Sequence, residues 1–240
     1  MIVKDNTSSC LYPFRYESDM RAPVLNWLRN RGLHAELEVQ MPWGTADIVA
    51  LRPNKGQVSK RIQYGQLKKL GNISRFRVLE MVPDVDTGKS VTLRTLAKRV
   101  AEGCSGDLDL LNHLHALERD SFIQQPKRGH FQKLNGWQPL QEILLSIELK
   151  LDRFRDALSQ ARQNMAAVNE SYVAFPSKVA ERIACSKRGN ELRREGIGLL
   201  SVGDSGCHRI ITAKTNRNVS LPIIESNLVE RFWETMIKDS

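Results

Sequence analysis

The sequence predicts an α/β domain with a mixed sheet that is interrupted by an inserted, mainly helical module. Segments with helical spacing and segments with strand-like alternation follow one another over residues 17–51, and again after Pro139. Between these two stretches, from the turn-forming run 53–56 onward, helical spacing predominates. The expected organisation is an α/β domain formed by residues 1–51 and 142–240, and an insertion formed by residues 52–141.

The first α/β stretch begins with a helix. Apolar residues recur at helical spacing from Glu17 to Arg31, and Gly32 ends the pattern. Because proline is unfavourable inside a helix, Pro23 places the helix start near Arg21. A hairpin follows, and its two strands and the turn between them are expected at residues 33–39, 46–51 and 42–44.

The inserted module is expected to hold three helices and a strand pair. Asp107 is the expected cap of the third helix. The helices are placed at residues 76–81, 93–101 and 108–122, and the strand pair around residues 126–130. Three helices followed by a basic hairpin are typical of a winged-helix module, and a small helical bundle of another kind remains the alternative.

Alternating strands and helices return after Pro139. Residues 143–147 are a nearly continuous apolar run, which indicates a strand that is buried on both faces. An amphipathic helix through residues 154–168 follows it. Further elements are expected at residues 172–175 (strand), 179–184 (helix), 197–202 (strand) and 225–238 (docking helix). This order predicts a partly parallel sheet with right-handed crossovers.

Composition favours a polyanionic partner. The 240 residues are 41% hydrophobic and 26% charged, and a net charge of +9 favours nucleic acid because each neutralised phosphate releases counterions. A basic protein without such a role remains the alternative. The four cysteines are far apart and show no zinc-ligand spacing, so reduced thiols are expected. Without a long apolar run or a signal-like segment, we expect a soluble cytoplasmic protein that has no membrane association.

Chemistry is expected at the tripeptide Glu148-Leu149-Lys150. Alternation along a strand places the carboxylate and the ammonium on one face, where the first can bind a divalent cation and the second can assist an attacking water. A solvated charge pair at a strand end is the alternative interpretation. Asp47 lies in a second apolar run, where a bare carboxylate is costly unless it has a partner or a metal. Its alternative interpretation is a solvent-facing residue at a turn.

The order of helix, hairpin with Asp47, strand with Glu148-Leu149-Lys150, helix and strand resembles the PD-(D/E)XK nuclease superfamily, which has the restriction-endonuclease-like fold. The resemblance covers residues 17–51 and 142–202. Two departures stand out: Ala46 replaces the proline before Asp47, and the insertion separates Asp47 from Glu148.

The resemblance implies a magnesium site, with manganese as the alternative metal. Asp47, Glu148 and the Leu149 carbonyl would hold the ion, and Lys150 would assist the water. Glu17 and Gln160 match further family positions near the metal and the scissile phosphate. A favourable acid at a helix start and a plain polar flank are equally acceptable interpretations of these two residues.

Basic residues suggest where DNA would bind. Lys127, Arg128 and Lys133 lie around the expected hairpin of the insertion, and Arg188 belongs to a second cluster before the last core strand. The third helix of the insertion is rich in acids and is a poor electrostatic match to DNA, so the hairpin is expected to contact phosphates. A protein-binding role for the insertion and a solvated helix face at Arg188 remain open.

Together these features favour a metal-dependent DNA endonuclease of a restriction-like, DNA-repair or genome-defence kind. Two alternatives remain: a non-enzymatic winged-helix DNA-binding regulator, and a nuclease subunit that needs a partner. A homodimer and a protein partner bound through the insertion are also left open.

Overall fold

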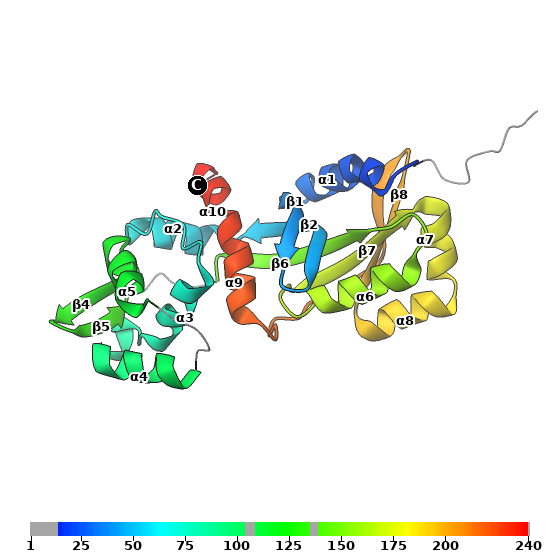
Figure 1. Ribbon diagram of the computed structural model, residues 1–240. Helices are drawn as coiled ribbons and strands as arrows, with labels where there is room; N and C mark the ends of the chain where they lie inside the picture. The colour runs from blue at the N-terminus through cyan, green and yellow to red at the C-terminus, as the bar shows by residue number, and fades with distance from the viewer. Residues whose placement is uncertain (1–13, 104–108, 135–138, 240) are drawn as a thin grey trace, which may run out of the picture. The chain divides into compact units, whose positions relative to one another are not determined.

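The computed structural model describes residues 14–103, 109–134 and 139–239 (Figure 1). The chain divides into two compact units. Unit 1 comprises residues 1–50 and 145–219, and unit 2 comprises residues 51–144 and 220–240. Each unit is described by itself.

Unit 1 contains a mixed six-stranded sheet in the order β1-β2-β6-β7-β8-β9. Strands β6, β7 and β8 are parallel, and β9 is antiparallel to β8. The bounds of the strands are β1 His34–Met41, β2 Gly44–Pro53, β6 Gln141–Leu149, β7 Glu170–Pro176, β8 Gly198–Gly203 and β9 Gly206–Ile211. Residues 51–53 of β2 and residues 141–144 of β6 belong to unit 2.

Helices cover both faces of this sheet, as the ribbon in Figure 1 shows. The ring of Tyr172 on β7 meets Trp27 of α1, whereas Val173, on the opposite face, packs with α6, α7 and α8. The bounds of the helices are η1 Glu17–Met20, α1 Arg21–Arg29, α6 Phe154–Asn164, α7 Ser177–Ala184 and α8 Lys187–Glu195. The α/β class with a mixed sheet flanked by helices is confirmed.

The first helical segment follows its sequence pattern. The α-helix begins at Arg21 after a short 3-10 turn, so Pro23 lies in its first turn, where a missing N–H is tolerated. Gly32 adopts a φ of +68° just beyond the helix end, a conformation that favours glycine.

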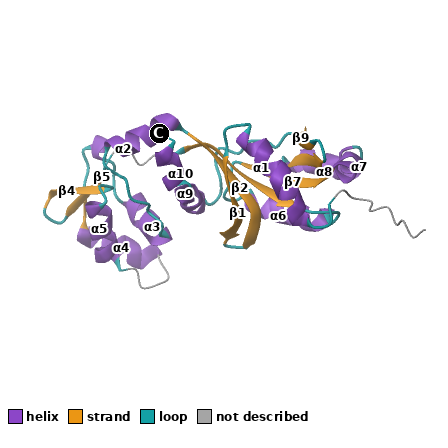
Figure 2. Cartoon of the chain, turned by 90° about the horizontal axis from the view of Figure 1, so that it is seen from above, coloured by secondary structure: helices purple, strands orange, loops and turns teal. Residues whose placement is uncertain are grey.

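Unit 2 contains a three-stranded antiparallel sheet in the order β3-β5-β4. Figure 2 shows this sheet and its neighbouring helices by type of secondary structure. Leu79, Leu96, Leu114, Leu117 and Phe131 are buried in one apolar cluster, so helices and sheet share a core. The elements are α2 Lys55–Gln63, α3 Ile73–Met81, η2 Val85–Thr87, β3 Val91–Thr92, α4 Leu93–Gly103, α5 Leu110–Arg119, β4 Ile123–Lys127, β5 His130–Lys133, α9 Pro222–Arg231 and α10 Trp233–Lys238.

The C-terminal segment differs from its expectation in two ways. It forms α9 and α10 instead of one helix, and it belongs to unit 2 and not to the α/β domain. Its place in unit 2 is supported by a buried ion pair between Arg61 of α2 and Glu230 of α9, whose side chains are 0% and 1% exposed. In addition, the Nε1–H of Trp233 donates to the Leu67 carbonyl at 2.9 Å. Apolar spacing alone cannot reveal which distant residue a buried charge will meet.

Helices α2 and α8 and strand β9 have weak sequence signals and received no predicted bounds, although a solvated helix face was left open at Arg188. Helix α8 buries only Gly189 and Leu192, so it lacks an apolar stripe. Helix α2 is similarly polar, and β9 buries only its last residue, Ile211. Asp107, the expected cap of the third inserted helix, lies outside the described residues. The cap seen for α5 is Asp109, whose Oδ1 accepts from the N–H of Asn112 at 3.2 Å.

Candidate active site

Two adjacent strands bring the predicted acidic residues together in unit 1. Asp47 lies on β2, and Glu148 and Leu149 end the neighbouring strand β6. Although they are 102 positions apart in sequence, Asp47 Oδ2 accepts a hydrogen bond from the Leu149 N–H at 2.8 Å. The carboxylate of Asp47 is therefore held at the end of β6 by a direct contact.

The Lys150 ammonium lies among several oxygens. Its Nζ is 3.4 Å from Asp47 Oδ2 and 4.0 Å from Glu148 Oε2. It also lies 3.8 Å from Glu17 Oε2 and donates to the Leu149 carbonyl at 3.0 Å. Because the Lys150 side chain is only 7% exposed, its charge is directed at these oxygens and little of it reaches solvent.

Glu148 is oriented from the helix side. Its register partner on β7 is Val173, so it faces the side of the sheet that α6 covers. Asn164 of α6 donates from Nδ2 to Glu148 Oε1 at 2.7 Å, and Trp43 Nε1 donates to Asn164 Oδ1 at 2.8 Å. The other carboxylate oxygen, Oε2, is buried and has no hydrogen-bond partner in the described part of the chain.

This environment raises the pKa of Glu148 to about 7. Burial is the main cause, and the charge of Asp47 adds to it. The hydrogen bond from Asn164 and the charge of Lys150 act in the opposite direction and lower the pKa. Ionisation of both Asp47 and Glu148 is therefore unfavourable unless additional positive charge lies close to them.

The donor set suits a hard divalent cation. Asp47, Glu148 and the Leu149 carbonyl offer oxygens only, and Glu148 Oε2, which lies 4.0 Å from Lys150 Nζ but accepts no hydrogen bond from a described residue, is an acceptor that a cation would satisfy. Within residues 14–103, 109–134 and 139–239, no three His, Cys, Asp or Glu side chains form a ready metal-ligand group. Two carboxylates and one carbonyl form a set of oxygen donors of the kind that hard divalent cations accept.

Glu17 and Gln160 occupy the edge of the site. Glu17 begins the short 3-10 turn before α1 and contacts both Lys150 and, at 3.5 Å, Arg153. Gln160 lies one turn before Asn164 on α6, and its buried Oε1 has no hydrogen-bond partner in the structure as described. No contact of Gln160 with the carboxylates or with Lys150 is observed between described residues.

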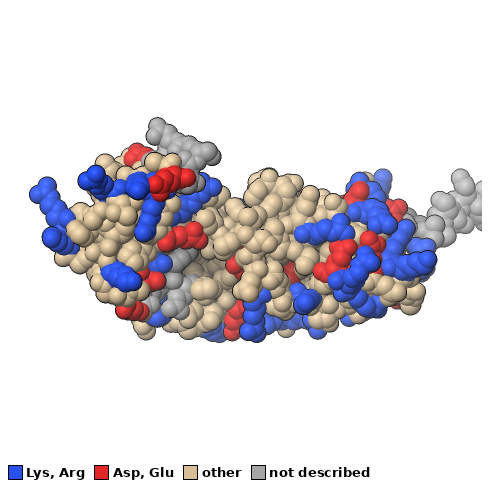
Figure 3. All heavy atoms as spheres, turned by 90° about the horizontal axis from the view of Figure 1, so that it is seen from below, with Lys and Arg blue, Asp and Glu red and all other residues tan. Residues whose placement is uncertain are grey.

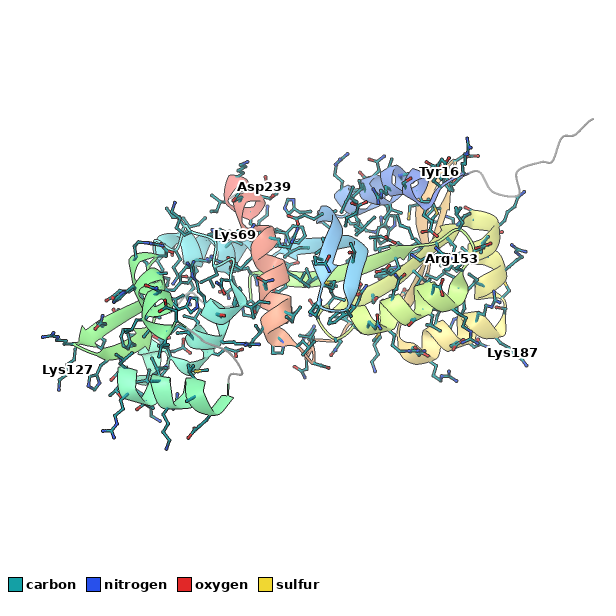
Figure 4. All side chains as sticks on the ribbon, in the orientation of Figure 1. Tyr16, Lys69, Lys127, Arg153, Lys187 and Asp239 are labelled. Atoms are coloured by element: carbon teal, nitrogen blue, oxygen red, sulfur yellow. The ribbon has the colours of Figure 1, made fainter. Side chains whose placement is uncertain are left out.

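The predicted DNA-binding residues fall into three situations. Lys127 and Arg128 are exposed at the end of the β4–β5 hairpin, and Figure 4 labels Lys127 there, directed away from the ribbon. Lys133 forms an ion pair within unit 2: its side chain is 13% exposed, and its Nζ lies 3.5 Å from Asp84 Oδ1. Arg188 is exposed on α8, with its guanidinium 5.3 Å from the centre of the Phe154 ring.

Asn164 and Trp43 are site residues that the sequence did not single out. Asn164 is 2% exposed and interrupts the apolar stripe of α6, between Ala161 and Val168. A polar residue at such a position needs a buried partner, and this interruption was the available signal. Trp43 lies in the turn of the hairpin and carries no comparable signal.

Comparison with protein-family models, curated proteins and solved structures finds no match to the chain. Among the helices described, none is long and apolar enough to cross a membrane.

Proposed function

We propose that this chain is a metal-dependent DNA endonuclease of the PD-(D/E)XK kind, with a restriction-endonuclease-like catalytic domain. The observation that supports this most is the convergence of Asp47 and Glu148 on one ammonium, that of Lys150, at 3.4 and 4.0 Å. The three residues come from sequence segments that the insertion separates, and all three lie in unit 1. A solvated charge pair at a strand end would not bury Glu148 to 1% exposure.

Asp47, Glu148 and the Leu149 carbonyl would hold Mg²⁺, or Mn²⁺ in its place. When bound, the ion supplies positive charge beside the phosphate that is cut. Asn164 directs Glu148 by fixing Oε1 and leaving Oε2 available. Asp47 is held in place by the Leu149 N–H, so the ligands are arranged before substrate arrives.

Lys150 would act on the attacking water. Its contact with the Leu149 carbonyl holds the ammonium beside the carboxylates, where it can orient the water and neutralise negative charge that develops on the phosphate. Glu17 contacts the same ammonium at 3.8 Å and would help to position it. Hydrolysis of the phosphodiester bond by in-line attack is the reaction that this set of groups supports.

Unit 2 would help to bind the DNA. Its order α3, β3, α4, α5, β4, β5 fits the winged-helix pattern of three helices followed by a hairpin. The exposed Lys127 and Arg128 at the hairpin end would contact phosphates and would not read bases. The proposed partner of the chain is therefore DNA. A second polypeptide would be a further partner if unit 2 docks to a protein.

The same features of unit 2 also favour a second candidate, a DNA-binding regulator or a nuclease subunit that acts only with a partner. In that case unit 1 would not cut DNA when alone. Cleavage by the purified chain distinguishes the two candidates.

The test is incubation of supercoiled plasmid with the wild-type chain in Mg²⁺, in parallel with Asp47→Ala, Glu148→Gln and Lys150→Ala. The proposal expects nicked or linear product from the wild type only, and none in EDTA. Absence of cleavage by the folded wild type would favour the regulator or subunit. Equal cleavage by the wild type and Lys150→Ala would contradict the catalytic role proposed for Lys150.

A further inference from the structure

A groove lies beside the candidate active site in unit 1. It starts at the loop that leads from Lys150 to α6, and Figure 4 labels Arg153 in this region. Its volume is about 330 Å³, and it opens to solvent between this loop and helices α7 and α8. The residues that line it are Asp152, Val179, Arg182, Ile183, Ser186 and Arg188.

The arginines of this groove differ in their pairing from Arg155 and Arg162 on α6. Arg155 Nη1 lies 3.1 Å from Glu191 Oε1, and Arg162 donates two hydrogen bonds, from Nε and Nη2, to the carboxylate of Glu195. Arg182 and Arg188, in contrast, make no ion pair with a carboxylate in the part of the chain that the structure describes. Figure 3 shows one face of the molecule, where the blue side chains over α6–α8 are interspersed with red ones.

The contacts that hold the two groove arginines leave most of their N–H donors available. Arg182 donates from Nε to the Lys178 carbonyl of its own helix at 3.3 Å. The guanidinium of Arg188 lies 5.3 Å from the centre of the Phe154 ring, a contact that leaves its N–H groups available. Two exposed guanidinium groups therefore line one groove, and each keeps N–H groups that can donate to a ligand.

The corner between α7 and α8 is close-packed, which fixes the relative positions of these arginines. A Cβ atom on Gly189 would lie 2.5 Å from the Ala184 carbonyl oxygen, so the first turn of α8 contacts the end of α7 directly. Ser186 caps α8 by accepting from the Arg188 N–H at 3.2 Å. Arg182 and Arg188 therefore project from a rigid corner.

We propose that this groove binds the phosphodiester backbone of the DNA strand that enters the active site. The inference rests on the proposed nuclease function and adds the place where the strand is held. Guanidinium groups recognise phosphate oxygens through paired N–H donors, and the groove begins two residues after Lys150. Asp152, also exposed in the lining, repels phosphate and confines the strand to the arginine side.

The experiment measures binding without cleavage. Fluorescence anisotropy of a labelled duplex is followed in EDTA over a range of salt concentrations, for the wild type and for Arg182→Ala/Arg188→Ala. The matched control is Arg155→Ala/Arg162→Ala, which changes the net charge by the same amount on the same unit. Circular dichroism verifies that both variants are folded.

The groove variant is expected to bind roughly tenfold more weakly near 0.1 M salt, with a salt slope smaller by about two, because two phosphate contacts are lost. The control is expected to stay close to the wild type, and Asp152→Asn is expected to bind more tightly. Equal binding by the groove variant and the wild type would overturn the proposal, and so would equal losses in groove and control variants. Neither outcome affects the plasmid-cleavage test, which depends on Asp47 and Lys150.

Discussion

The carboxylate of Asp47 accepts a hydrogen bond from the backbone N–H of Leu149, at 2.8 Å. This contact ties β2 to the end of β6 and gives Asp47 two roles, as an acceptor within the sheet and as a negative charge in the site. The two roles can be separated by substitution.

Asp47→Asn keeps an acceptor oxygen for the Leu149 N–H but removes the charge. We expect its stability to stay within about 1 kcal/mol of the wild type, while cleavage falls at least roughly 100-fold. Asp47→Leu, the comparison variant, leaves the buried N–H without a partner and should lose both stability and activity. Urea unfolding together with plasmid cleavage measures both effects. Full activity in Asp47→Asn would rule out a charge-based role.

Asn164 is expected to act as a positioning residue through Glu148. Asn164→Leu removes the donor to Glu148 Oε1 and should raise the Mg²⁺ concentration needed for half-maximal cleavage by roughly tenfold, as supporting residues of metal ligands do. The KM for DNA should not change. Trp43→Phe, which removes only the donor to Asn164, should have a smaller effect in the same direction. An unchanged Mg²⁺ requirement in Asn164→Leu would contradict this role.

The raised pKa of Glu148 predicts a pH dependence of stability in the metal-free protein. Between the ordinary pKa of 4.5 and the folded-state pKa of about 7, the unfolded chain releases this proton while the folded chain keeps it. The free energy of unfolding should therefore fall as pH rises through this window, by at most about 3 kcal/mol from this group. Glu148→Gln, which cannot ionise, should lack this component. The measurement is the difference between the urea-unfolding free energies of the two proteins at pH 4.5, 6 and 7.5. A pH-independent difference would contradict the assignment.

The buried pair Arg61–Glu230 is expected to hold the C-terminal helices in unit 2. Arg61 also lies over the Trp233 ring, at 3.8 Å from its centre, and Glu230 Oε2 accepts from the Leu70 N–H at 2.8 Å. Glu230→Gln leaves a buried guanidinium without its counter-charge and should destabilise unit 2 by about 3–5 kcal/mol. Glu102→Gln, in the exposed pair with Lys98, should change stability by less than about 0.5 kcal/mol. Thermal unfolding of both variants tests this contrast, and equal melting temperatures would refute it.

The residues of the candidate site that were predicted from the sequence are those with a local signal. Asp47 and Glu148 are charged residues in or at the end of apolar strands, and the α/β class follows from alternating periodicities around them. Their mutual contact could be expected only from the resemblance to a family, because strand alternation says nothing about which strands become neighbours.

The remaining features depend on tertiary partners. Glu230 looks like an ordinary polar residue of an amphipathic helix, yet it is buried by its contact with Arg61. Lys133 resembles the other basic residues of the hairpin, although it is largely buried beside Asp84. Helix α8 has too few apolar residues for its spacing to be detected, so the corner that places Arg188 was not predictable.

The most direct test of the central claim is Mn²⁺ binding, measured by the electron paramagnetic resonance signal of the free ion. The account predicts a site in the wild type that is lost in Asp47→Ala and in Glu148→Gln. The site should be retained in Lys150→Ala, where a competing ammonium is removed, even though that variant no longer cuts DNA. Equal Mn²⁺ binding by the wild type and Asp47→Ala would contradict the claim that Asp47 and Glu148 jointly hold a metal ion.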